Sequence, residues 1–273
     1  MNSYFVVAGM LKESLSSTMN DNNIQNLLNH IQAFELCFQK VHIVIVCNPD
    51  AVYQKLQNLK PNFQDRLHLI LAPHTLRTDS RCQNQNNQNN LHTYDYRRLD
   101  KMAGLRNIYL DYIRNHAILQ NFDLLGVLDM DLLGTIQPER IRHSTNRLLS
   151  NSEFDGIACN GKLAHWKHQS MYLYFDSFSF VDSMGRHTSK WERMNPFLFL
   201  WRYPKLQNSH SKLQRVQSAF GGFCLYKMVP ALGARYATKK IGQNYTSEHI
   251  FFHSYLSLAL DPSLLFLITH NTT

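Results

Sequence analysis

Two carboxylates stand one residue apart at the end of the most apolar run in the chain. Asp129 and Asp131 follow Leu124–Leu128 within the segment NFDLLGVLDMDLLG. The continuous apolar run predicts a strand that is buried on both faces. If the strand continues through the two aspartates, they project to the same side. Because ligands of open α/β sheets bind beyond the carboxyl ends of the strands, the pair would then lie at a ligand site.

Two ionised carboxylates beside an apolar core are costly unless a positive charge neutralises them. A divalent cation would do so, because Mg²⁺ and Mn²⁺ prefer oxygen ligands and typically take one or two carboxylates together with substrate phosphates. The alternative interpretation is that Asp129-Met130-Asp131 is a solvated loop after a strand. The apolar strand in front of the motif favours the metal interpretation.

The first third of the chain alternates between strand and helix patterns. Apolar β-rich runs predict strands, and apolar residues at helical spacing predict helices. In chain order, these are strand Tyr4–Ala8, helix Ile24–Phe38, strand Val41–Cys47, helix Ala51–Leu59 and strand Arg66–Leu71. This order implies a parallel sheet covered by helices. The polar run Gln83–Asn90 then predicts a flexible surface loop rather than a domain boundary.

The same alternation resumes after the polar run and predicts one α/β domain with a mostly parallel central sheet flanked by helices. The later segments are helix Leu99–His116, strand Leu124–Leu128, strand Phe154–Cys159, an irregular aromatic stretch Ala164–Leu206, a turn and strand Ser218–Tyr226, helix Thr246–Leu260 and strand Leu264–Thr269.

Composition indicates a globular protein with a basic surplus. The chain has 273 residues, 44% hydrophobic and 18% charged, with a formal net charge of +8. The surplus fits nucleic acid, a membrane surface or an anionic small substrate. No apolar run approaches the length of a membrane span, and the start lacks signal-peptide features. We therefore expect a cytoplasmic protein, or one attached peripherally to a membrane through its basic surface.

Several other site types find no support in the sequence. The five cysteines are scattered without a CxxC pair, which predicts reduced core residues rather than disulfides or a zinc site. The chain also lacks the GxGxxG fingerprint, the phosphate-binding P-loop and the nucleophile elbow. These absences argue against dehydrogenase, nucleoside triphosphatase and α/β-hydrolase functions.

The stretch Arg97–Gly134 resembles the core of nucleotide-sugar-dependent glycosyltransferases of the GT-A fold. In that family a helix carrying Arg-Asn, here Arg106-Asn107, precedes a strand that ends in the DxD metal motif. Further segments resemble the branch of fungal capsule-type α-mannosyltransferases and related bacterial and large-virus enzymes: YFDSFSFVDSMGR (Tyr174–Arg186), QSAFGGFCLYK (Gln217–Lys227) and SEH (Ser247–His249). The chain departs from the branch at Val181, where an arginine is expected.

The resemblance implies a single GT-A, Rossmann-like domain with a nucleotide-sugar-binding half, residues 1–134, and an acceptor-binding half, residues 135–273, which contains the irregular aromatic segment. The implied activity is transfer of a sugar from a nucleoside-diphosphate sugar to a glycan or other hydroxyl acceptor, in surface polysaccharide or glycoconjugate synthesis. Mn²⁺ or Mg²⁺ is the implied cofactor. Donor base, donor sugar, acceptor and oligomeric state stay open.

On the donor side, the resemblance implies that Asp131 binds the cation directly and that Asp129 binds the cation or the ribose. Arg106 would bind the diphosphate or the donor sugar through the paired N–H donors of its guanidinium group, or else be a solvated surface residue. Asn107 would hydrogen-bond nearby backbone at the edge of the site.

The first strand is expected to end at Ala8-Gly9, a turn that borders the nucleotide base in GT-A enzymes. Gly9 would permit close backbone approach, or it would simply make a turn. Many GT-A enzymes also take a metal ligand from a histidine near the C-terminus. His270, which follows the last predicted strand, is the first choice for that ligand, and His249 and His253 compete with it.

On the acceptor side, Glu248 is the expected catalytic carboxylate. It would take the acceptor's proton in an inverting enzyme and hold the acceptor in a retaining one. The alternative is ordinary helix capping by Ser247 or Thr246 with Glu248 in the first turn. The other expected acceptor-side residues are Asp176, Asp182, Gly221, Gly222 and His249.

Two other functions compete. A metal-dependent nuclease or phosphodiesterase would use the same aspartates, but such sites usually gather more Asp, Glu and His ligands. A nucleic-acid-binding protein without catalysis would explain the pI of about 9.2. However, the basic residues are dispersed and no binding signature is present, so we expect no nucleic-acid partner.

Overall fold

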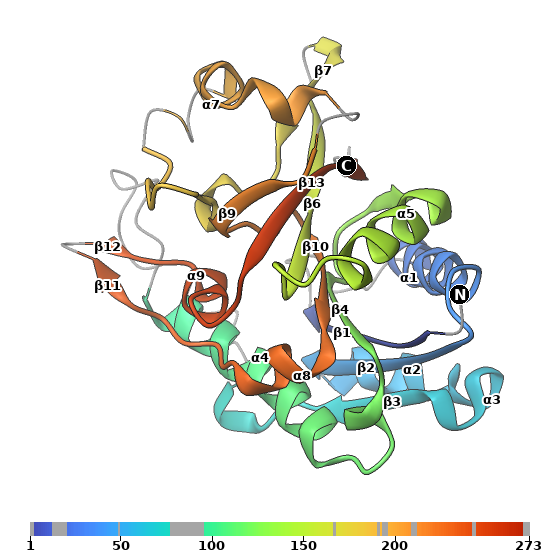
Figure 1. The fold of residues 1–273 in the computed structure, drawn as a ribbon. Coiled ribbons are helices and arrows are strands. Elements are labelled where there is room, and N and C mark those ends of the chain that lie inside the picture. The colour runs from blue at the N-terminus through green and yellow to red at the C-terminus, as the bar shows by residue number, and fades with distance from the viewer. Residues whose placement is uncertain are drawn as a thin grey trace.

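A mixed β-sheet forms the centre of the single α/β domain (Figure 1). The computed structural model describes residues 3–12, 21–48, 50–76, 96–165, 168–189, 192, 196–208, 212–241 and 244–269. The sheet order is β3 (Leu67–Leu71), β2 (Lys40–Asn48), β1 (Tyr4–Lys12), β4 (Leu124–Asp129), β10 (Phe223–Lys227), β6 (Gly156–His165), β13 (Leu258–Ile268), β9 (Gln214–Ser218) and β8 (Val181–Asp182). Two further strands, β5 (Gly134–Ile136) and β7 (His168–Tyr174), pair with β13 and β6.

Most strands run in one direction, as the sequence predicts. The pairings β3-β2-β1-β4 and β6-β13 are parallel, whereas β10 is antiparallel to both of its neighbours, β4 and β6. The described helices are α1 (Asp21–Glu35), α2 (Asp50–Gln57), α3 (Lys60–Phe63), α4 (Tyr96–Asn115), α5 (Pro138–Leu149), α7 (Pro196–Arg202), α8 (Met228–Gly233) and α9 (Glu248–His253). None of them is long and apolar enough to span a bilayer.

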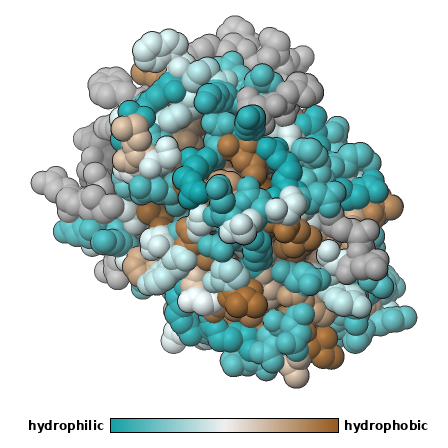
Figure 2. Space-filling model, in the orientation of Figure 1, coloured by the Kyte–Doolittle hydropathy of each residue, from teal (hydrophilic) through white to brown (hydrophobic). Residues whose placement is uncertain are grey.

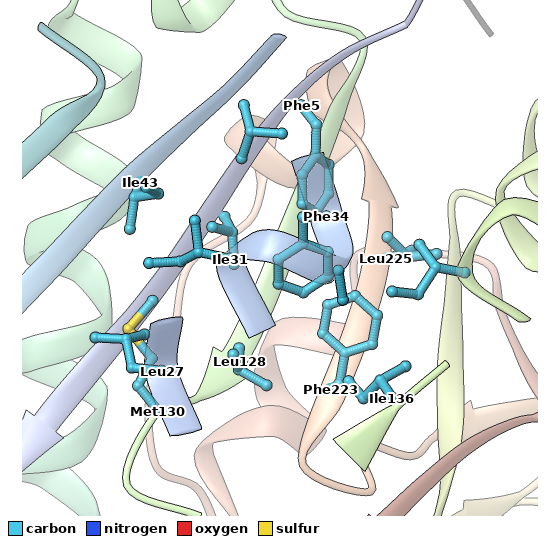
Figure 3. Close-up of a cluster of buried hydrophobic side chains, with 14 of the residues drawn as sticks. Phe5, Leu27, Ile31, Phe34, Ile43, Leu128, Met130, Ile136, Phe223 and Leu225 are labelled. Carbon is cyan, nitrogen blue, oxygen red and sulfur yellow. The ribbon is translucent and has the colours of Figure 1, made fainter. Parts of the chain in front are cut away.

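Alternate residues along each strand pack on opposite faces of the sheet. In β1, Phe5 and Val7 join the cluster under α1, α2 and α5, while Val6 and Ala8 join the cluster under α4, α8 and α9. Figure 3 shows the first cluster, in which aromatic and aliphatic side chains of α1 lie against those of β1, β4 and β10. Both faces of the sheet are therefore covered, as a parallel sheet requires.

Two expected boundaries are wrong, and one stretch is more regular than expected. Strand β1 does not end at Ala8 but continues to Lys12, because it pairs with β2 as far as Asn48 and with β4 as far as Asp129. The last helix, α9, ends at His253, and residues 258–260, which were expected to belong to it, begin β13, where pairing with β6 outweighs helical spacing. Within the stretch expected to be irregular, the structure contains the regular elements β7, β8 and α7.

The glycine pair before β10 makes the turn that brings β10 alongside β4. Gly221 and Gly222 have φ angles of +65° and +92°, in the left-handed region that favours glycine. A Cβ atom on Gly221 would lie 2.4 Å from the carbonyl oxygen of Cys159. Both glycines therefore adopt backbone conformations that other residues rarely adopt, as inferred from the sequence.

We expect Gly221→Ala to lower the free energy of unfolding by about 3 kcal/mol, because it adds a backbone clash to a strained φ angle. Urea denaturation measures the change. Gly233→Ala is the matched control, since a Cβ atom there meets nothing within 4 Å. An equal effect of both variants would contradict this account of the turn.

Candidate active site

Arg106 lies in the interior, on the buried stripe of α4. Leu99, Ala103, Leu110 and Ile113 occupy this stripe, and Arg106 takes the position between Ala103 and Leu110. Its side chain is only 2% exposed. A charge at such a position is costly unless it is paired, so its partners define the site.

Two carboxylates from distant parts of the chain pair with Arg106. Its Nη2 atom donates to Oδ1 of Asp129 at 2.8 Å, and its Nε atom donates to Oε1 of Glu248 at 3.0 Å. The guanidinium also lies over the rings of Phe220 and Tyr236, at 5.3 and 5.6 Å from the ring centroids. Burial by itself would lower the pKa of Arg106, but the negative charges, first of all that of Asp129, raise it above its ordinary value.

Strand alternation explains why Asp129 reaches Arg106. Leu125 and Val127 face the α4 side of the sheet, and Asp129 is the next residue on that face. The strand then ends, and the amide of Leu132 donates to the carbonyl of Asp129 in a turn. Asp131 is exposed in this turn. The condition for both aspartates to project together, a continuing strand, is therefore not met.

Glu248 is the first residue of α9 and is buried. The Ser247 hydroxyl caps the helix by accepting the amide hydrogen of His249, as the capping interpretation predicts. It also lies 2.8 Å from the hydroxyl of Ser179. Capping and an ion pair with Arg106 thus coexist at this helix end.

Asp176 precedes Ser179 in the same loop. It has a left-handed φ of 63°, unusual for a residue with a side chain. Although part of the residue is accessible, loss of hydration raises the pKa of its carboxyl group to about 8, and the charges of Asp129 and Glu248 add to the rise. A hydrogen bond from Ser179 and the charge of Arg106 act in the opposite direction. The carboxyl group of Asp176 is therefore a third one, after those of Asp129 and Glu248, that interacts electrostatically with Arg106.

The glycine turn and Gly9 both pack against the end of β4. The amide of Asp129 donates to the carbonyl oxygen of Gly222 at 3.0 Å. A Cβ atom on Gly9 would lie 2.3 Å from the carbonyl oxygen of Leu128. Gly9 therefore does permit a close backbone approach, but it lies within β1 and the neighbouring backbone is that of β4.

The side chains of two expected site residues, Asn107 and Asp182, form hydrogen bonds within the protein. Asn107 exchanges two hydrogen bonds with the backbone of Tyr236, at 2.8 and 2.9 Å, which confirms the expected backbone contact. The carboxylate of Asp182 accepts hydrogen bonds from Arg186 and from the amide of Met184. Burial would raise the pKa of Asp182, but these hydrogen bonds outweigh it and lower the pKa.

The histidines of α9 are both buried. His249 stacks on Phe220 with the ring centroids 3.8 Å apart. His253 bridges the hydroxyl groups of Ser218 and Tyr226, at 2.9 and 2.7 Å. Desolvation, followed by the charge of Arg106, lowers the pKa of His253 to about 3, so this ring is neutral. His270 lies outside the described residues, as does the polar loop 83–90.

Phe220 and Tyr236, which cover Arg106, were not predicted from the sequence. Phe220 directly precedes the glycine pair, which is a local signal. Tyr236 has no such signal, because only the packing of its segment against α4 brings it there.

A divalent cation fits only a site that a ligand helps to complete. In the described part of the chain, no three His, Cys, Asp or Glu side chains are placed to hold a metal together. Asp129 already accepts a hydrogen bond from Arg106. Asp131 is exposed in the turn after β4, and an exposed carboxylate suits a cation that takes one or two carboxylates and fills its shell with phosphates and water.

Comparisons with known proteins identify the fold. No protein-family model matches the chain, and no curated protein matches it. The solved structure of GalNAc-T7 with UDP, GalNAc and Mn²⁺ is similar with a TM-score of 0.52 and 9% identity, over 98% of this chain and 43% of that one. The structure of residues 1–349 of TarS from S. aureus is similar with a TM-score of 0.47 and 9% sequence identity, over 98% of this chain and 60% of that one. The chain thus spans less than two thirds of either. The fold is the expected GT-A fold, whereas the fungal and viral branch is not distinguished.

We expect Arg106→Met to destabilise the protein by about 3–5 kcal/mol, because it leaves two carboxylates without their buried partner. Adding Glu248→Gln should recover part of the loss in a double-mutant cycle. Arg142→Met removes an exposed ion pair with Glu139 and should cost less than about 0.5 kcal/mol. If Arg106→Met changes stability as little as the control, the ion pairs do not matter to the fold.

The neutral His253 predicts loss of stability in acid. Between pH 6.5, the ordinary pKa of histidine, and about pH 3, His253 is protonated in the unfolded chain but stays neutral in the folded chain. Stability contributed by the neutral ring is therefore present above pH 6.5 and lost as the pH falls toward 3. His253→Gln should reduce this loss by up to about 5 kcal/mol in urea titrations across that window, and the exposed His143→Gln should not. Equal pH profiles for wild type and His253→Gln would refute the prediction.

Proposed function

We propose that the chain is a glycosyltransferase that moves a sugar from a nucleoside-diphosphate sugar to a glycan or other hydroxyl acceptor, with a divalent cation. One observation carries the proposal. On a GT-A fold, a buried arginine joins the carboxylate that ends β4 to the carboxylate that opens α9. GalNAc-T7, of similar fold, was solved with UDP, GalNAc and Mn²⁺.

The donor half is proposed to be residues 1–134. Asp131 would hold the cation, which supplies Lewis-acid stabilisation to a leaving diphosphate when bound. The pairing of Asp129 with Arg106 supports a role toward the ribose rather than a direct bond to the cation. Ala8 and Gly9 would lie near the base, and His270 stays the proposed further ligand.

The acceptor half is proposed to be residues 135–273. Arg106 orients the carboxylate of Glu248 through a charge-assisted hydrogen bond. An oriented carboxylate can accept the proton of an acceptor hydroxyl, or hold that hydroxyl if the enzyme is retaining. Asp176, Asp182, the glycine turn and His249 complete the proposed acceptor side.

The role proposed for Arg106 differs from the sequence expectation. A fork that reaches the diphosphate needs an exposed guanidinium, whereas this one is buried beneath Phe220 and Tyr236. We therefore propose that Arg106 positions Asp129 and Glu248, and that Asn107 fixes Tyr236 over it. Hexosyl transfer, polysaccharide or glycoconjugate synthesis and a cytoplasmic location remain parts of the same proposal.

Nucleotide binding tests the proposal. UDP, GDP and dTDP, each with and without Mn²⁺, should be compared by thermal shift, and at least one should stabilise the protein only with the metal. Asp131→Asn should remove the metal-dependent shift. Glu248→Gln should keep it, because that residue serves the acceptor. Asp65→Asn is the matched control, since Asp65 is exposed before β3, at the other end of the strands.

Three outcomes would contradict the proposal. Stabilisation by DNA alone would indicate a nucleic-acid-binding protein, and metal-dependent cleavage of a nucleic acid would indicate a nuclease. A full metal-dependent shift in Asp131→Asn would show that the cation is held elsewhere.

A further inference from the structure

The aromatic side chain of Phe199 packs helix α7 against the domain. Phe199 is 2% exposed and stacks on Tyr174, with centroids 5.0 Å apart and an interplanar angle of 15°. Its ring also packs edge-to-face with Phe180 and at a tilt to Tyr203, with centroids 5.2 and 5.0 Å apart. Such a cluster fixes which side of the short helix turns outward.

The outward side of α7 is apolar. Leu198 and Trp201 lie three residues apart, so they share one face of the helix, and Trp201 is 82% exposed. The described residues include other exposed apolar side chains, such as Val229 and Tyr255, but these belong to separate elements. Single exposed apolar residues are ordinary, whereas a group of them indicates a contact surface.

The turn after β8, which is linked to the end of α7, carries a third exposed apolar side chain. Met184 is 74% exposed. Its amide and the hydroxyl of Tyr203 both donate to the carboxylate of Asp182, at 2.9 and 3.3 Å. Asp182 therefore ties the Met184 turn to the end of α7. We call Met184, Leu198 and Trp201 the α7 patch.

The sequence around the α7 patch carries a surplus of positive charge. Residues 181–212 contain six Lys or Arg and two Asp or Glu, which amounts to half of the chain's formal charge of +8. Both acidic residues are buried in ion pairs, Asp182 with Arg186 and Glu192 with Arg202. Arg186 and Lys205 are exposed. In Figure 2 the coloured residues at the upper end of the molecule, where Figure 1 places α7, are mostly pale to teal, with isolated brown side chains among them.

We propose that the α7 patch docks the protein on the surface of an anionic lipid membrane. Tryptophan with aliphatic neighbours enters the boundary between headgroups and acyl chains, and basic residues beside it are attracted to anionic lipids. An anionic glycan would also attract the basic residues, but the aliphatic side chains of Leu198 and Met184 do not form hydrogen bonds with sugar hydroxyl groups. The proposal deepens the membrane association expected from charge and does not depend on the transferase activity.

Vesicle sedimentation with the full chain tests the proposal. The protein should bind vesicles of phosphatidylcholine with phosphatidylglycerol, and bind phosphatidylcholine alone at least about tenfold more weakly. Trp201→Ser and Leu198→Ser should each weaken binding to the anionic vesicles by about tenfold, because binding scales with inserted apolar area. Their melting temperatures should stay near that of the wild type, since both side chains are exposed.

Val229→Ser is the matched control. Val229 is 81% exposed, but it lies on α8, at the other end of the molecule from α7 (Figure 1). It should leave vesicle binding unchanged. No binding to anionic vesicles, unchanged binding by Trp201→Ser, or equal loss in Val229→Ser would each overturn the proposal. Tighter binding to dextran sulfate than to vesicles would assign the surface to a glycan instead.

Discussion

The charge of Arg106 is the constraint on which the site depends. Moving a guanidinium out of water costs several kcal/mol, and only well-placed hydrogen bonds and opposite charges offset that cost. The structure supplies both, from Asp129 at the end of a central strand and from Glu248 at the start of a late helix. Two aromatic faces complete the enclosure. Because the two carboxylates are 119 positions apart in sequence, their shared partner also fixes how the two halves of the chain meet.

The surrounding contacts keep this arrangement rigid. The amide of Asp129 is held by the Gly222 carbonyl, Ser247 is held by Ser179, and Asn107 holds the backbone of Tyr236. Each contact orders a segment that carries a site residue. Preorganisation of this kind is what a polar site on an α/β sheet needs, since a misplaced charge in the interior would be destabilising.

Much of the fold could be predicted because strand and helix patterns reflect burial, which is local in sequence. The alternation of the first third gave β1, α1, β2, α2 and β3 in the right order, with errors at element ends such as β1 and α9. The errors arose where pairing with a distant strand decided the outcome. The burial of Arg106 had a local signal, its place between Ala103 and Leu110 on the apolar stripe of α4, but charge alone suggested the surface.

By itself, the sequence determined the class of fold, the acidic residues at the end of β4, the freedom required at Gly221 and Gly222 and the capped start of α9. These depend on residue type and spacing over a few positions. Only the tertiary structure decided that Arg106 joins Asp129 to Glu248, that Asp131 lies exposed in the turn after β4 and that α7 presents Trp201 outward. The physical reason is that an ion pair or an exposed face depends on which distant surfaces meet, and local periodicity carries no information about that.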